Sequence, residues 1–228
     1  MNKWQEIWNK NERINKIILE MLIKADGFDS GAGSFDVNNW LEYTNYHFSK
    51  IDIKDNDTIF DVGCGSGAFL FPLYLKNYKI GGMDYSKILI ELAKKIMPEY
   101  NFECNEAINL DITKKYNIVF SHSVFHYFKD LEYAKIVIKK MIKKANKKIV
   151  ILDINDKTKE QEYHQIRMAE MDKKEYEEKY KGLEHLFYEK QWFEDIANEF
   201  NVKKIDIFDQ TFENYTNSKL RFNVIMEK

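Results

Sequence analysis

The residues best suited to chemistry lie in one short segment, TIFDVGCGSG, between Thr58 and Gly67. An acid, Asp61, stands near the end of an apolar run, and glycines follow at alternate positions, beginning with Gly63 and Gly65. Glycine permits positive φ and lets a ligand approach the backbone, while the start of a helix offers unpaired N–H groups. A strand that turns over glycines into a helix is typical of nucleotide-binding α/β domains. The segment therefore predicts a site for a nucleotide-like ligand.

Asp61 favours one kind of nucleotide-like ligand over another. A carboxylate two residues before the first glycine would repel a pyrophosphate, but it would accept hydrogen bonds from an ammonium group. S-adenosylmethionine carries such an amine and no phosphate, whereas dinucleotide cofactors carry a pyrophosphate. The spacing Gly63-x-Gly65-x-x-Ala68 also satisfies the permissive dinucleotide fingerprint. From these residues alone, a dehydrogenase and a methyltransferase both remain open.

Further polar residues fall where later strands should end. Asp84 follows the run KIGGM, 17 residues after Gly67, and an acid at that point can bind both ribose hydroxyls. The segment Asn105-Glu106-Ala107 follows the third strand, where a side-chain acceptor could meet an adenine amine. Ligands of open α/β sheets bind at the carboxyl edge of the strands. The segment SHSVFHYFKD brings three more candidates to that edge: Ser121, His122 and His126.

A predicted alternation of strands and helices positions these residues. Seven strands are expected, at 58–62, 78–83, 101–104, 116–121, 147–153, 202–208 and 219–226. Helices are expected at 3–24, 39–48, 66–76, 86–97, 129–144 and 189–200, with a long charged helical stretch at 157–181. Strands that alternate with helices of this length imply parallel pairing through right-handed crossovers.

Taken in order, these motifs resemble those of the class I S-adenosylmethionine-dependent methyltransferases. DVGCGSG is similar to that family's first motif, the acid at Asp84 to its ribose-binding motif, and Asn105-Glu106-Ala107 to its adenine-contacting segment. The resemblance covers about residues 57–153. It implies a Rossmann-like α/β fold whose seven-stranded sheet has the order 3-2-1-4-5-7-6, with the last strand antiparallel. It also implies S-adenosylmethionine as the cofactor.

The same resemblance assigns roles to individual residues. The glycine loop would hold the methionine end of the cofactor, Asp84 would bind ribose, and Tyr85 would stack near the adenine. Where the family usually has Gly-Asp-Ala, this chain has Asn105-Glu106-Ala107, and the longer Glu106 side chain puts the adenine contact in question. The residues implied for the cofactor are Asp61, Gly63, Cys64, Gly65, Asp84, Tyr85, Glu106, Ala107 and, against the methionine part, Ser121.

Two histidines after the fourth strand are candidates for a catalytic base. Methyl transfer needs a nucleophile held at about 3 Å from the methyl group, with its proton removed. For a hydroxyl acceptor a histidine suits this task, because its ordinary pKa of about 6.5 lies near neutral pH. We predict His126 as the first choice and His122 as the second, although a histidine here often only packs or binds the backbone. No metal is expected, because Ser121-His122 stands where catechol-type metal-dependent enzymes need an acid.

The methyl acceptor is predicted to be a small, polar, anionic metabolite. Arg167, Lys190 and Arg221 could bind a phosphate or carboxylate, although surface salt bridges would explain each of them alone. The segments GAGSFD, HLFYEKQWF and YTNSKLRFNV resemble methyltransferases of bacterial capsule or lipopolysaccharide modification. That resemblance implies O-methylation of a sugar, sugar nucleotide or phosphoramidate in surface polysaccharide biosynthesis. The predicted substrate-binding residues are Tyr43, His47, His164, Arg167, Tyr188 and Arg221.

The composition favours a cytoplasmic bacterial domain that binds neither nucleic acid nor membrane. Its 228 residues carry 35 Lys and Arg against 37 Asp and Glu, without a basic cluster interleaved with aromatic residues. No apolar run reaches the roughly 20 residues that span a bilayer, and the first residues lack a signal-peptide core. We expect residues 1–50 to form a helical cap on a core at 51–228. That core carries a helical lid insertion at about 157–188, and the protein is a monomer or homodimer.

Two other functions remain open. One is a catalytically silent subunit that binds S-adenosylmethionine or serves as a scaffold, and the other is an NAD-dependent oxidoreductase. The intact acid and glycine positions argue against the first, and Asp61 ahead of the glycines argues against the second. Cofactor binding separates the oxidoreductase from the methyltransferase.

Overall fold

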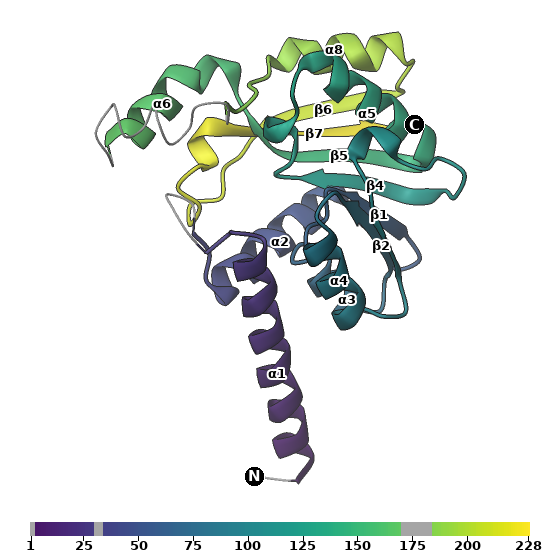
Figure 1. The fold of residues 1–228 in the computed structure, drawn as a ribbon, viewed down its shortest axis with the longest axis vertical. Helices are drawn as coiled ribbons and strands as arrows, with labels where there is room; N and C mark the ends of the chain where they lie inside the picture. The colour runs from purple at the N-terminus through teal and green to yellow at the C-terminus, as the bar shows by residue number, and fades with distance from the viewer. Residues whose placement is uncertain (1–2, 30–33, 170–183) are drawn as a thin grey trace.

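The computed structural model describes residues 3–29, 34–169 and 184–228 (Figure 1). The strands are β1 (Thr58–Val62), β2 (Lys79–Asp84), β3 (Asn101–Cys104), β4 (Tyr116–His122), β5 (Ala145–Asn155), β6 (Lys204–Asp209) and β7 (Arg221–Glu227). The α-helices are α1 (Lys3–Ala25), α2 (Val37–Ile51), α3 (Phe71–Leu75), α4 (Lys87–Ile96), α5 (Leu131–Lys144), α6 (Glu160–Ala169) and α8 (Lys190–Glu199). Short 3-10 turns are η1 (Ala107–Asn109), η2 (Phe125–Tyr127), η3 (Lys157–Lys159) and η4 (Ser218–Leu220).

The strands form one mixed sheet in the order β3-β2-β1-β4-β5-β7-β6. The first five strands pair in parallel, and β7 runs antiparallel to both β5 and β6. The predicted strand order and the antiparallel last strand are confirmed. In a parallel sheet the carboxyl ends of the strands share one edge, so β1, β2 and β4 present their following loops together.

Helices cover both faces of the sheet (Figure 1). Side chains of α1, α2, α3 and α4 join one buried apolar cluster, and those of α5 and α8 join the other. Strand β5 shows the pleat that separates these layers, because Val150 and Leu152 belong to the first cluster while Ile149 and Ile151 belong to the second. Burial on both faces explains why this strand is apolar at successive positions.

The helix after the glycine loop begins later than predicted. We expected it at 66–76, but α3 comprises only Phe71–Leu75. Gly67 has φ of +90°, which a right-handed helix cannot contain, and turns occupy the chain up to Leu70. Pro72 then lies in the first turn of α3, where a missing N–H costs nothing.

The two N-terminal helices meet the sheet differently. Helix α2 begins at the N-cap Asp36, whose carboxylate accepts from the Asn39 N–H, and it buries Trp40, Tyr43 and Phe48 against the sheet. Helix α1 extends away from the body, and its carboxyl end reaches the core through Leu19, Leu22 and Ile23 (Figure 1). That end comes close to the glycine loop.

The predicted charged helix at 157–181 lies partly outside the described residues. Its described part consists of η3 and α6, which leave the body next to the end of β5 (Figure 1). Tyr163 of α6 packs with Phe187 and Leu220 in a small apolar cluster, and Lys219 forms an ion pair with Glu162. Residues 170–183 are not described.

Candidate active site

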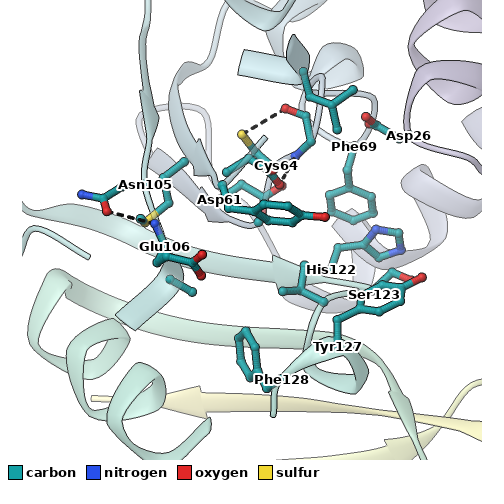
Figure 2. Close-up of a pocket in the computed structure, with 18 of the residues that line it drawn as sticks. Asp26, Asp61, Cys64, Phe69, Asn105, Glu106, His122, Ser123, Tyr127 and Phe128 are labelled. Carbon is teal, nitrogen blue, oxygen red and sulfur yellow. Dashed lines mark hydrogen bonds between the residues drawn. The ribbon is translucent and has the colours of Figure 1, made fainter. Parts of the chain in front are cut away.

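A cavity of about 710 Å³ opens at the carboxyl ends of β1, β2 and β4 (Figure 2). Nine residues predicted from the sequence line it: Asp61, Gly63, Cys64, Gly65, Asp84, Tyr85, Glu106, Ala107 and His122. The described wall also includes residues that sequence reasoning did not select as site residues, chiefly Asp26, Phe28, Phe69, Ser123, Val124 and Tyr127. The cavity therefore joins the glycine loop, the ends of β2 and β4, and the segment after α1.

The glycine loop is held against β2 by its backbone. The N–H groups of Gly63 and Cys64 both donate to the Met83 carbonyl, at 2.8 and 2.9 Å. Gly63 and Gly65 have positive φ, and a Cβ on Gly63 would lie 2.4 Å from Cγ2 of Val124. The loop conformation and the close approach of the next strand's loop thus both require glycine at position 63.

Asp84 ties the loop to the start of α4. One of its carboxylate oxygens accepts from the Gly65 N–H at 3.0 Å, and the other accepts from the Ser86 N–H at 2.8 Å. Each carboxylate oxygen can accept more than one hydrogen bond, so these contacts leave Asp84 able to meet ligand hydroxyls in the cavity that it lines.

Asp61 is the most unusual group in the cavity. It is 1% exposed, and its Oδ1 has no hydrogen-bond partner among the described residues. Burial, together with the nearby carboxylates of Asp84 and Asp26, raises the pKa of Asp61 to about 8. A buried carboxylate without a partner is costly, and a cationic donor from a ligand would remove that cost. The site therefore fits a ligand that carries an ammonium group.

At the end of the cavity that follows β3, hydrogen bonds orient the lining side chains. The Asn105 amide oxygen accepts from the Glu106 N–H at 2.9 Å, and the Tyr133 hydroxyl donates to a Glu106 carboxylate oxygen at 3.3 Å. Tyr85 is 74% exposed beside this end, so its ring is available to a flat ligand group. Glu106 is thus oriented by a residue of α5, a feature that the local sequence does not reveal.

Among the described residues, the histidine that lines the cavity is His122. It is buried and stacks on Phe69, with ring centroids 4.3 Å apart. Its Nε2 lies 2.9 Å from the hydroxyl of Tyr43, which in turn accepts from the Gln210 amide at 3.1 Å. Burial lowers the pKa of His122 to about 4, so the ring is neutral at pH 7. The structure brings Tyr43 and His122 together, as two of the predicted site residues.

His126 lies outside the described cavity wall. It belongs to η2, is 2% exposed, and its Nδ1 accepts from Nη1 of Arg221 at 3.4 Å. Burial and the neighbouring Arg221 guanidinium hold the pKa of His126 well below its usual range. Its neighbour Tyr127 instead lines the cavity and is 67% exposed.

Arg221 is the centre of a cluster of buried polar side chains next to the cavity. Its guanidinium donates to the Asn155 side chain, and its Nε lies 3.7 Å from Oδ1 of Asp153. The other Asp153 oxygen accepts from the hydroxyls of Ser123 and Tyr215, at 2.8 and 3.1 Å. Both Ser123 and Asp153 have positive φ. Such strained non-glycine residues persist where surrounding contacts fix them, and they cluster at functional sites.

The remaining predicted residues do not reach the described cavity wall. The Ser121 hydroxyl donates to the Val62 carbonyl, and the Tyr188 hydroxyl donates to the Phe125 carbonyl, so both tie the interior together. His47 is fully buried among aromatic rings. His164 and Arg167 lie on α6, with the Arg167 guanidinium 5.0 Å from the Tyr163 ring centre.

The described ranges contain neither a cluster of metal ligands nor a membrane-spanning helix. Within them, no three His, Cys, Asp or Glu side chains are grouped to hold a metal ion. The described helices also include none with the length and apolar character needed to cross a membrane.

The comparison with protein families decides the class of this chain. A model described as a methyltransferase domain matches residues 53–221, which is more than half of the chain. The chain belongs to this methyltransferase family. The methyltransferase fold class predicted from the sequence is confirmed, and so is the predicted family at this level.

Curated relatives of this methyltransferase match only part of it. A malonyl-[acyl-carrier protein] O-methyltransferase from Acetivibrio thermocellus is 31% identical over 127 residues, which cover 52% of this chain and 43% of that protein. A protein of the same name, numbered 1, from Ilyobacter polytropus is 30% identical over 113 residues, which cover 45% of this chain and 41% of that protein. The matches span less than half the length of these relatives.

Solved structures resemble the methyltransferase over nearly its whole length. The plantazolicin methyltransferase BpumL, solved with a pentazolic desmethylPZN analogue and S-adenosylhomocysteine, has a TM-score of 0.62 and 16% identity, covering 96% of this chain and 98% of that one. The magnesium protoporphyrin IX methyltransferase of Synechocystis, with bound S-adenosylhomocysteine, has a TM-score of 0.58 and 15% identity, covering 93% and 98%. At these identities the likeness establishes the fold.

Proposed function

We propose that the protein transfers a methyl group from S-adenosylmethionine to an oxygen atom of a small anionic acceptor. The observation that carries the proposal is the buried, unpartnered oxygen of Asp61 beside the glycine loop. It matches the methionine ammonium of this cofactor and opposes the pyrophosphate of a dinucleotide. The family membership and the cofactor products bound in two structural neighbours support the same reading.

Different residues of the cavity bind different parts of the cofactor. Asp61 and the glycine loop hold the methionine end, and Asp84 accepts from the ribose hydroxyls. Tyr85, Glu106 and Ala107 surround the adenine, with Glu106 held in place by Tyr133. When bound, S-adenosylmethionine supplies an electrophilic methyl group on a sulfonium sulfur.

The acceptor lies on the β4 side of the cavity, where His122, Ser123 and Tyr127 line the wall and His122 stacks on Phe69. These groups combine an apolar, aromatic surface with few polar contacts, which excludes water and orients a small molecule. His126, our first choice as a base from the sequence, supports this wall from behind through Arg221. Ser121 likewise acts from the interior.

An anionic oxygen is the acceptor that suits these groups. A carboxylate or phosphate oxygen is already deprotonated at pH 7, so it needs no strong base, whereas the low pKa of His122 makes that histidine a weak one. Two relatives named as O-methyltransferases support oxygen as the methylated atom.

The acceptor predicted from the sequence, a sugar, sugar nucleotide or phosphoramidate of surface polysaccharide biosynthesis, falls in this class where it carries a phosphate or other anionic oxygen. We also propose that the helices of residues 1–50 cap the site and that the insertion at about 157–188 closes over the acceptor. Arg167, His164 and Tyr188 belong to or adjoin that insertion. A bacterial cytoplasmic location and a monomeric or homodimeric state remain predictions.

Calorimetric titration with S-adenosylhomocysteine, and with NADH as the control, tests the cofactor. We expect micromolar binding of S-adenosylhomocysteine alone, and at least a tenfold loss in Asp61→Asn, because the amide removes the charge that pairs with the ammonium group. Asp55→Asn, at an exposed aspartate, is the matched control and should bind like the wild type. Binding of NADH alone would replace this proposal with an oxidoreductase. Binding of neither ligand would favour a silent scaffold subunit.

A further inference from the structure

A carboxylate from outside the sheet accepts hydrogen bonds from backbone N–H groups of the glycine loop. Asp26 follows the last residue of α1, and its Oδ1 accepts from the Ser66 N–H at 2.6 Å. Its Oδ2 lies 3.3 Å from the Ala68 nitrogen, which also donates to it. Figure 2 shows Asp26 on the cavity wall, beyond Phe69 and on the far side of the loop from Glu106. One carboxylate therefore bridges two backbone donors of the loop.

A side chain at position 65 would collide with this carboxylate. A Cβ built on Gly65 would lie 2.5 Å from Oδ1 of Asp26 and 2.7 Å from its Cγ. Gly65 also has positive φ and donates its own N–H to Asp84. Glycine at position 65 is thus required by a contact with another residue of the chain itself.

The end of α1 is fixed to the same loop by a second contact. The hydroxyl of Ser66, fully buried, donates to the Leu22 carbonyl at 3.2 Å. Ser66 thus donates its N–H to Asp26 and its hydroxyl to the last turns of α1. In turn, Asp26 and Phe28 place this segment on the cavity wall. The contacts that position the glycine loop are therefore the same contacts that fix the end of α1.

In many nucleotide-binding folds, backbone N–H groups of a glycine loop bind phosphate. Here two such groups are already satisfied by a negative charge. A phosphate brought to them would have to displace Asp26 or lie beside its carboxylate and that of Asp84, which lines the same cavity. A cofactor with an amine and without phosphate meets no such repulsion.

We propose that Asp26 is a positioning and specificity-determining residue of the cofactor site: as a built-in anion it fixes the glycine loop and denies its N–H groups to phosphate. This inference deepens the proposed function and rests on it for the identity of the cofactor. It assigns to the segment after α1 a role in cofactor choice that the local sequence motif does not carry.

The variants Asp26→Ala and Asp26→Asn test the role, with Asp29→Ala at a nearby exposed aspartate as the matched control. We expect Asp26→Ala to bind S-adenosylhomocysteine at least tenfold more weakly in calorimetry, and Asp26→Asn to lose less, because an amide oxygen still accepts one N–H. Formate at tens of millimolar should restore affinity in Asp26→Ala and leave the wild type unchanged. Inorganic pyrophosphate should bind Asp26→Ala and not the wild type.

A second readout does not depend on the cofactor. Amide hydrogen exchange at Ser66 and Ala68 in the free protein should accelerate at least tenfold in Asp26→Ala and remain at the wild-type rate in Asp29→Ala. If the wild type fails to bind S-adenosylhomocysteine while these amides respond, the proposed function falls and the positioning role of Asp26 stands. Wild-type exchange and affinity in Asp26→Ala, or reduced affinity that formate does not restore, would overturn the role. Circular dichroism checks that each variant is folded, and Asp26→Asn serves if Asp26→Ala is not.

Discussion

The two sides of the cavity are held together by different kinds of contact. On the β1–β2 side, the N–H groups of Gly63 and Cys64 donate to the Met83 carbonyl, and the Gly65 N–H donates to Asp84, 19 residues away. On the β4–β5–β7 side, buried side chains meet across long separations, as with His126 and Arg221, which are 95 residues apart. The first side uses a local turn and the second uses the completed sheet.

This difference sets how each side responds to change. A backbone cradle tolerates little variation, since its shape depends on glycine conformations and on close approach. A buried network of side chains depends instead on each charge keeping its partner. We therefore expect substitutions on the first side to act on cofactor affinity, and those on the second side to act on stability while affinity is retained.

The largest effect should follow Gly63→Ala. The new methyl group would lie 2.4 Å from Cγ2 of Val124, in a residue with φ of +83°. The loop must then move, and the N–H contacts of Gly63 and Cys64 to Met83 move with it. We expect binding of S-adenosylhomocysteine to weaken by about 100-fold or more, measured by calorimetry, because the contacts of the cradle are lost together.

Gly27→Ala separates backbone strain from close approach. Gly27 has φ of +77°, similar to that of Gly63, but a Cβ there meets nothing within 4 Å. Its cost should be confined to the strain of a left-handed alanine, on the order of 1–2 kcal/mol. If the two variants lose cofactor affinity equally, close approach at Gly63 is not what shapes the cradle.

The second-largest effect is expected on the β4–β5–β7 side of the cavity. Arg221→Met should destabilise the fold by about 3–5 kcal/mol, because it leaves the buried carboxylate of Asp153 without its cation. Affinity for S-adenosylhomocysteine should stay within about twofold of the wild type, since Arg221 is not on the described cavity wall. Urea unfolding and calorimetry on the same preparation measure both quantities.

Lys190→Met is the matched control at the same edge of the sheet. Lys190 pairs with Asp209 at 2.6 Å and with Asp156 at 3.6 Å, and its side chain is 40% exposed. Exposed pairs contribute about 0–1 kcal/mol, so this variant should unfold nearly like the wild type. A loss as large as that of Arg221→Met would mean that burial does not separate the two sites.

The contrast between the two sides also explains what the sequence could predict. The strands follow from apolar patterning, and their order follows from the resemblance to class I methyltransferases. Asp61, Gly63 and Gly65 belong to one continuous motif, and Asp84 ends the next strand, so their geometry is local. Their presence on the cavity wall needs no knowledge of distant contacts. The helix after the loop was misplaced only because the turns up to Leu70 continue the apolar pattern without being helical.

The positions of residues on the β4–β5–β7 side could not be predicted from the local sequence. His126 and Tyr127 are neighbours in sequence, yet the 3-10 turn η2 sends one behind the cavity and the other onto its wall. Nothing in the spacing of the histidines predicts that direction. Asp26 shows the same limit on the cofactor side, because its role depends on where a separate helix docks. A single Asp-Gly pair after a helix reads as an ordinary helix end.

The smallest effect, and the one that links affinity to stability, concerns the charge of Asp61. Its pKa is about 8 in the folded protein and about 4 in an unfolded chain, so folding takes up a proton between these values. Stability from this group is present below pH 4 and is lost as the pH rises toward 8. Asp61→Asn removes the titration. Its stability relative to the wild type should therefore grow by up to about 1.4 kcal/mol per pH unit between pH 6 and 8.

Urea unfolding of both proteins at pH 6, 7 and 8 measures this growth. A difference that stays constant with pH would show that Asp61 is ionised throughout, and that Asp26 and Asp84 do not affect its proton. A growing difference, with cofactor affinity lost in Asp61→Asn, would show that the fold keeps a destabilising carboxylate because a cationic ligand needs it. The unpartnered oxygen would then mark a site whose stability is completed by its cofactor, in contrast to the β7 side, where Arg221 and Asp153 already compensate each other.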